Sequence, residues 1–202
     1  MGQFVFNLLF LIIMIKNKTT NEISIKGFHG TTEKNADKIL ESGFQISKNN
    51  EDWLGNGVYF FIDGISNPLF SAIEWASNTH GKLNCAVIES DILIQAKDIL
   101  DLTTSKGLIT YNYLRNKIIT RDYSELLHRR DLGIKKRRDI RVDDRIITNK
   151  LFSLTNYKAI IHQVYIKTVL QRTLALESSY PNSTVLCIKN PCAIQLSKKI
   201  PL

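Results

Sequence analysis

The residues with the clearest chemical potential lie between positions 27 and 75. Residues 29–31 read His-Gly-Thr and follow a short segment in which apolar and polar residues alternate. An imidazole at the end of a strand can donate or accept a hydrogen bond, and a neighbouring glycine lets a ligand approach the backbone closely. Residues 55–57 read Gly-Asn-Gly and lead into an aromatic run that begins at Tyr59. These residue types predict a cleft with a hydrogen-bonding histidine, close-approach glycines and an aromatic wall.

The elements that must position these residues follow from the hydrophobic pattern. Alternation over residues 22–28 predicts a half-buried strand that ends at His29. Helical spacing then predicts a helix of about three turns that is capped by Thr31 or Thr32 and stops at Gly43. The histidine is therefore expected at a strand-to-helix junction.

The remaining chain predicts a single α+β domain over residues 19–202. The apolar run at residues 58–62 predicts a central strand, and a helix is expected from about residue 67 to about residue 81. Further strands are expected within residues 84–102, 158–166 and 184–188, and the charged residues 103–154 predict a helical, basic insertion. Strands at both ends with helices between them imply a mainly antiparallel or mixed sheet.

Residues 1–18 are expected to form an apolar N-terminal extension. The twelve residues 4–15 are apolar except for Asn7, a length too short for an ordinary membrane-spanning helix. No Lys or Arg precedes this run and no clear cleavage site follows it, so a cytoplasmic protein is expected, with membrane tethering or export as the alternatives. A chain starting at Met14 would lead directly into the first strand. The three cysteines lack metal-ligand spacing and are expected to be buried thiols, and no metal is expected.

The charge of the chain favours polyanionic partners. The sequence carries 27 Lys and Arg residues against 19 Asp and Glu residues, a formal net charge of +8. A dense basic run is a candidate nucleic-acid contact, and its alternative is a solvated helix face or loop. The candidate contact residues are Arg129, Arg130, Lys135, Lys136, Arg137 and Arg138.

The order of the motifs resembles the ADP-ribosyltransferase fold. The matching pieces are His-Gly-Thr at residues 29–31, Glu-Ser-Gly-Phe at 41–44, Gly-x-Gly-Val-Tyr-Phe at 55–60, and a helix that carries Ser-Ala at 71–72 and Trp75. The similarity is to the branch like the poly(ADP-ribose) polymerases, whose signature is a His, Tyr, Glu triad. It implies a split, mainly antiparallel sheet and NAD⁺ as a substrate that is cleaved.

The resemblance implies a role for each matching residue. His29 would hydrogen-bond the adenosine ribose, the backbone of Gly30 would hold the nicotinamide carboxamide, and Thr31 would assist through its hydroxyl. Tyr59 matches the triad tyrosine. The plain alternative is that the tyrosine belongs to the core and the histidine is a satisfied core or cap residue.

A second aromatic ring is implied opposite the tyrosine. Trp75 matches its place, and Phe70 matches it less well. The nicotinamide of NAD⁺ is a flat cation, which gains stacking and electrostatic attraction over an aromatic face. On a helix with this apolar pattern, the alternative for Trp75 is a core position.

The third member of the triad departs from the pattern. The resemblance places a glutamate near Val185 on the late strand, but residues 184–188 contain no carboxylate. Glu177, just upstream, is the nearest candidate, and its alternative is an exposed loop acid. A carboxylate matters because cleavage of the glycosidic bond passes through an oxocarbenium-like state.

These expectations combine into one leading function and two alternatives. The leading function is mono-ADP-ribosyl transfer from NAD⁺ to a protein or nucleic acid, in a toxin or defence protein of bacterial or viral type. The alternatives are an inactive module that binds NAD⁺ or ADP-ribose, and an RNA-binding or RNA 2′-phosphotransferase-like protein. The sequence lacks the Gly-rich dinucleotide fingerprint, the phosphate-binding loop and the Gly-x-Ser-x-Gly motif. NAD⁺ is therefore expected as a cleaved substrate and not as a redox cofactor.

Overall fold

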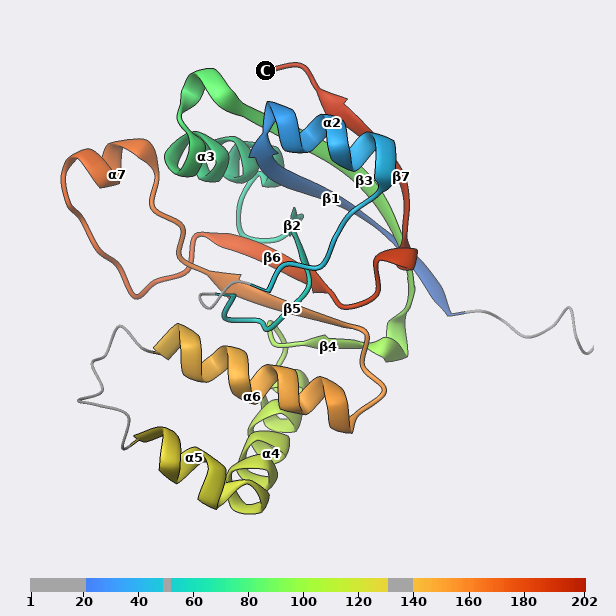
Figure 1. The fold of residues 1–202 in the computed structure, drawn as a ribbon, viewed down its shortest axis with the longest axis vertical. Helices are drawn as coiled ribbons and strands as arrows, with labels where there is room; N and C mark the ends of the chain where they lie inside the picture. The colour runs from blue at the N-terminus through green and yellow to red at the C-terminus, as the bar shows by residue number, and fades with distance from the viewer. Residues whose placement is uncertain (1–20, 49–51, 131–139) are drawn as a thin grey trace, which may run out of the picture.

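The computed structural model describes residues 21–48, 52–130 and 140–202, and its centre is a seven-stranded sheet (Figure 1). The strand order is β4-β5-β6-β2-β1-β3-β7, in which β4 and β5 are parallel and the other neighbours are antiparallel. The strands are β1 (Glu22–Thr32), β2 (Val58–Ile62), β3 (Cys85–Gln95), β4 (Ile99–Asp101), β5 (Ala159–Val164), β6 (Ser183–Ile188) and β7 (Ile194–Ile200). The mixed class and the mainly antiparallel sheet confirm the coarse prediction.

Helices lie on both faces and at one end of this sheet. They are α2 (Glu33–Ser42), α3 (Pro68–His80), α4 (Ser105–Arg121), α5 (Tyr123–Arg130), α6 (Ile140–Leu154) and α7 (Val169–Thr173). Figure 1 shows α4, α5 and α6 grouped beside β4 and β5, away from α2 and α3. The described part of residues 103–154 is therefore largely helical, as predicted.

The first strand is longer than predicted. β1 does not end at His29 but continues to Thr32, because it pairs with β3 along its full length, from Glu22 opposite Gln95 to Thr32 opposite Cys85. The helix signals were read correctly. The Thr32 side chain accepts a hydrogen bond from the backbone N–H of Asn35 at 3.1 Å, and α2 ends before Gly43.

The sheet opens between β1 and β2. These strands share two residue pairs, Gly27 with Ile62 and Phe28 with Phe61, after which β2 continues to pair with β6 while β1 continues with β3. Residues 29–32 thus have a strand partner on one side in the described sheet. Every second residue of a strand directs its N–H and C=O toward a given side, so backbone groups here face the opening.

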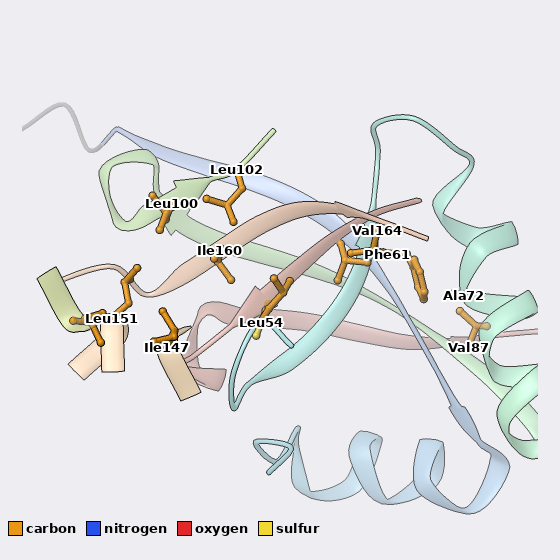
Figure 2. Packing of buried hydrophobic residues seen from close by; sticks show 13 residues of the cluster. Leu54, Phe61, Ala72, Val87, Leu100, Leu102, Ile147, Leu151, Ile160 and Val164 are labelled. Carbon is orange, nitrogen blue, oxygen red and sulfur yellow. The ribbon is translucent and has the colours of Figure 1, made fainter. Parts of the chain in front are cut away.

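Two apolar layers hold the sheet. The larger cluster joins the strands to α3, α4 and α6, and Figure 2 shows it stretching from Leu151 and Ile147 on α6 to Ala72 and Val87 at the other end. The opposite face packs around Phe60, which is fully buried, and α2 contributes its own buried residue there. Burial at about 25 cal/mol per Å² of apolar surface makes these layers the main source of stability.

The remaining elements match the predicted ones in part. The strands expected within residues 84–102 are β3 and the short β4, which the 3₁₀ turn Ala96–Asp98 separates. Within residues 103–154, Ile118 is buried, whereas Tyr113 is 57% exposed and Leu127 is 36% exposed. The edge strand β7 and the short helix α7 were not predicted. Edge strands carry polar side chains, and the sequence of β7 contains two lysines and a serine.

The apolar extension at residues 1–18 lies outside the described residues. In the described ranges, no helix is long and apolar enough to cross a membrane.

Candidate functional site

A cleft of about 910 Å³ lies where β1 and β2 separate. Its walls come from β1, β2, α2, the C-terminal half of α3 and the segment that joins α2 to β2. The volume is in the range of cofactor-sized pockets. Five of the residues predicted to bind a ligand line it: His29, Gly30, Thr31, Tyr59 and Trp75.

His29 bridges the split in the sheet. Its Nδ1 lies 2.8 Å from the backbone carbonyl of Tyr59, and because a carbonyl can only accept, Nδ1 carries the proton. In the neutral ring Nε2 is then a hydrogen-bond acceptor. Burial lowers the pKa of His29, while the hydrogen bond to the Tyr59 carbonyl partly opposes this shift. The histidine therefore enters the site as a neutral, oriented acceptor.

Aromatic rings fix the orientation of this histidine. Its ring meets Phe44 edge-on at 5.3 Å between centroids and lies 5.9 Å from Phe60. These two phenylalanines also contact each other edge-on at 5.1 Å. The two phenylalanine rings shield one side of the imidazole from water and restrict the rotamers that His29 can adopt.

Tyr59 turns its hydroxyl toward protein, not toward solvent. The O–H donates to the backbone carbonyl of Gly55 at 2.7 Å. Burial raises the pKa of Tyr59, and the nearby Cys187 and Asp52 raise it further. The ring is thus a neutral phenol whose face, not its oxygen, is suited to contact a ligand in the cleft.

Of the three glycines that line the cleft, Gly30 and Gly57 are required by the packing of the protein itself. A Cβ on Gly30 would lie 2.4 Å from the backbone oxygen of Ala72 on α3. A Cβ on Gly57 would lie 2.4 Å from the Cys187 sulfur on β6. Such approaches are far inside van der Waals contact. The sequence reasoning read these glycines as room for a ligand, whereas the structure shows that they make room for α3 and β6.

The turn before β2 is anchored by residues that the sequence reasoning missed. The Lys189 ammonium donates to the carbonyls of Leu54 at 2.7 Å and Asn56 at 2.6 Å. The Asn56 N–H donates to the side-chain oxygen of Asn149 on α6 at 2.8 Å. Burial lowers the pKa of Lys189. A charge-assisted clamp therefore holds the start of the strand that carries Tyr59.

Trp75 and Phe70 occupy different surroundings. Trp75 lines the cleft and meets His80, also a lining residue, edge-on at 5.7 Å. Phe70 is 56% exposed and does not line the cleft. Of the two aromatic candidates on α3, Trp75 lines the same cleft as Tyr59, and Phe70 lies outside it.

Glu177 is not brought to the cleft. Its side chain is 76% exposed and forms an ion pair with Lys167, beyond the end of α7. Val185, the strand position at which a glutamate was expected, lines the cleft and is buried. The geometry therefore does not support Glu177 as a partner of His29 and Tyr59.

The structure does not describe the side chains of the basic run predicted to contact nucleic acid. Arg129 and Arg130 end α5, but their side chains lie outside the described residues, as do Lys135, Lys136, Arg137 and Arg138. Its predicted contact with nucleic acid stays a prediction.

Two of the three cysteines are buried in the structure. Cys85 and Cys187 are buried, as predicted, whereas Cys192 is exposed, so its prediction as a buried thiol was wrong. No group of three or more His, Cys, Asp or Glu side chains in the described ranges could hold a metal ion.

Comparison with known proteins identifies a relative whose description states no activity. A protein of Methanocaldococcus jannaschii described as uncharacterized, MJ0359, is 26% identical to this chain over 192 residues. The matched region covers 83% of each of the two chains. No family model matches the sequence, and no solved structure matches it. The similarity extends well beyond the cleft motifs, so it concerns most of the domain.

Proposed function

We propose that this chain binds NAD⁺ in the cleft between β1 and β2 and transfers a single ADP-ribose to a macromolecular acceptor. The observation that carries the proposal is the meeting of His29, Tyr59 and Trp75 in one cofactor-sized cleft at a split in the sheet. These residues come from three different elements, and a ligand that needs an acceptor and two aromatic faces would find all of them there.

Each group fits one part of the ligand. The nicotinamide ring of NAD⁺ is cationic, and aromatic faces such as those of Tyr59 and Trp75 attract a flat cation by about 0.5–2 kcal/mol. The free Nε2 of His29 can accept a hydrogen bond from a ribose hydroxyl. The backbone of residues 29–32 has groups directed into the split, which can pair with a carboxamide as a missing strand would.

The acceptor in this proposal is a protein or a nucleic acid. The net charge of +8 favours a polyanion, because a positive surface attracts phosphate-rich partners. Digestion of the labelled product with nuclease or with protease distinguishes the two acceptors.

The test is binding of NAD⁺ and release of nicotinamide by the full chain. We expect Trp75→Ala to weaken NAD⁺ binding about tenfold or more, since base–aromatic stacking contributes on the order of 1–3 kcal/mol. Phe70→Ala is the matched control, because it removes an aromatic ring from the same helix outside the cleft. Equal effects of the two substitutions, or no binding by the unmodified chain, would refute the cleft as an NAD⁺ site.

A second candidate function is an NAD⁺-binding module without transfer activity. It is favoured by the apolar Val185 at the strand position where a carboxylate was expected, and by the distance of Glu177 from the cleft. Binding of NAD⁺ without any release of nicotinamide, in the presence of cell extract, would establish this candidate instead.

A further inference from the structure

The cleft contains a carboxylate that the sequence reasoning did not single out. Asp52 lies in the segment between α2 and β2 and is the one acidic residue among the described residues that line the cleft. It is half-buried. Its position just before the turn at Leu54 and Gly55 places it on the strand side of that segment, since the Gly55 N–H donates to the Asp52 carbonyl at 2.6 Å.

The Asp52 carboxylate is held in a defined orientation. The Ser47 hydroxyl donates to its Oδ2 at 2.6 Å. Ser47 is itself tied to the start of β2, because its backbone exchanges two hydrogen bonds with Gly57, at 3.0 and 3.3 Å. Two residues beyond Gly57 comes Tyr59. The carboxylate is therefore linked through two short contacts to the strand that carries the triad tyrosine.

Its charge also reaches the tyrosine. The negative charge of Asp52 is one cause of the raised pKa of Tyr59, after burial and Cys187. Both side chains line the same cleft, where partial burial weakens the screening of charge by water. A nicotinamide ribose beside the Tyr59 ring would lie within the same field.

We propose that Asp52 is the catalytic carboxylate of this cleft and takes the part that no carboxylate on β6 can take. The inference rests on the proposed NAD⁺ cleavage. In the reaction, the bond between nicotinamide and ribose breaks and its electron pair leaves with nicotinamide. The Asp52 carboxylate accepts a hydrogen bond from a ribose hydroxyl and stabilises the positive charge that develops on the sugar. The acceptor nucleophile then bonds to the anomeric carbon, and its proton passes to Asp52 and on to solvent.

The experiment compares Asp52→Asn with the unmodified full chain. Asparagine keeps an oxygen that can accept from Ser47, so the loop contact is preserved while the charge is removed. We expect nicotinamide release to fall about a hundredfold or more, in line with loss of a charge-stabilising group. NAD⁺ affinity, measured by calorimetry, should change less than about threefold, and the thermal midpoint should be retained. This split between turnover and binding would not follow from a loop defect.

Two further variants serve as a control outside the cleft and as a test of the contact between Ser47 and Asp52. Glu177→Gln removes a carboxylate outside the cleft and should leave turnover unchanged. Ser47→Ala removes the hydroxyl that donates to the Asp52 carboxylate and keeps the carboxylate itself. Turnover should fall about tenfold and stay measurable. Turnover by Asp52→Asn within about twofold of the unmodified chain overturns the inference and leaves the proposed function standing. An unmodified chain that binds NAD⁺ but releases no nicotinamide overturns it together with the transferase.

Discussion

Gly55→Ala offers the most direct test of how the cleft is held open. Gly55 has a φ of +80°, in the left-handed region that side chains rarely adopt. A methyl group there would lie 2.5 Å from the Asn149 side-chain oxygen and 2.9 Å from the Lys189 ammonium. The same Asn149 oxygen accepts the Asn56 N–H at 2.8 Å. The substitution therefore strains the backbone and displaces Asn149, one of the side chains that anchor the turn.

The backbone strain and the displacement of Asn149 each lower the free energy of unfolding by an amount that can be estimated. Alanine in the left-handed region costs about 1–2 kcal/mol. Displacement of Asn149 breaks its hydrogen bond to Asn56, which is worth about 1 kcal/mol in the net free energy of unfolding. We expect Gly55→Ala to lower the free energy of unfolding by about 2–3 kcal/mol in total. For a chain of 202 residues this corresponds to a fall of roughly 5–10 °C in the thermal midpoint.

The assay is urea unfolding of a double-mutant cycle. In an Asn149→Ala background the methyl group meets no amide, so the cost of Gly55→Ala should there be smaller by about 1 kcal/mol, while the backbone strain and the contact with Lys189 remain. Gly81→Ala is the matched control, since Gly81 has a φ of +83° and open space where its methyl would lie. Its cost should be the same in both backgrounds. Equal costs of Gly55→Ala in the two backgrounds, within about 0.5 kcal/mol, would refute the proposed coupling between the turn and α6.

Three further predictions concern the same region. Gly30→Ala should lower the free energy of unfolding by about 1–3 kcal/mol in urea titrations, because its methyl would lie 2.4 Å from the Ala72 carbonyl oxygen. The pKa of His29 is lowered in the folded chain, so the unfolded chain binds a proton first as the pH falls. The free energy of unfolding should therefore decrease as the pH falls through about 6.5. In His29→Gln, the free energy of unfolding from urea titrations should decrease less between about pH 7.5 and 5.5. A decrease of the same size as in the unmodified chain would contradict the lowered pKa of His29. Lys189→Met should leave two turn carbonyls unpaired and weaken NAD⁺ binding in calorimetry, and unchanged affinity would show that the clamp does not position the cleft.

The fold was predictable where the signals are local. The cap at Thr32 and the stop at Gly43 delimit α2, and the apolar run Val58–Ile62 is β2 residue for residue. Such signals need a window of a few residues, because caps, turns and strand alternation act over that distance. Errors arose where pairing partners decide the outcome, as at the end of β1, which extends to Thr32 because β3 accompanies it.

In the candidate site, too, local features were predictable from the sequence and long-range contacts were not. His29, Tyr59 and Trp75 lie within 47 residues of one another in sequence, and their order predicted that they would meet. Their contacts with the rest of the chain were not predictable in this way. Lys189 is 135 residues from Leu54, and no local pattern marks a buried ammonium that binds two carbonyls so far away.

The position of α6 gives the helical insertion a role that its charge did not suggest. The sequence predicted residues 103–154 to be a helical, basic insertion. The structure instead shows Asn149 of α6 holding Asn56, and Ile147 and Leu151 of the same helix packed into the larger core cluster. Because the turn at Asn56 leads directly into the strand of Tyr59, a shift of α6 would reach the cleft through the hydrogen bonds that Arg145 and Asn149 make with Asn56. A partner that binds the insertion and moves α6 would therefore act on the ligand site without touching it.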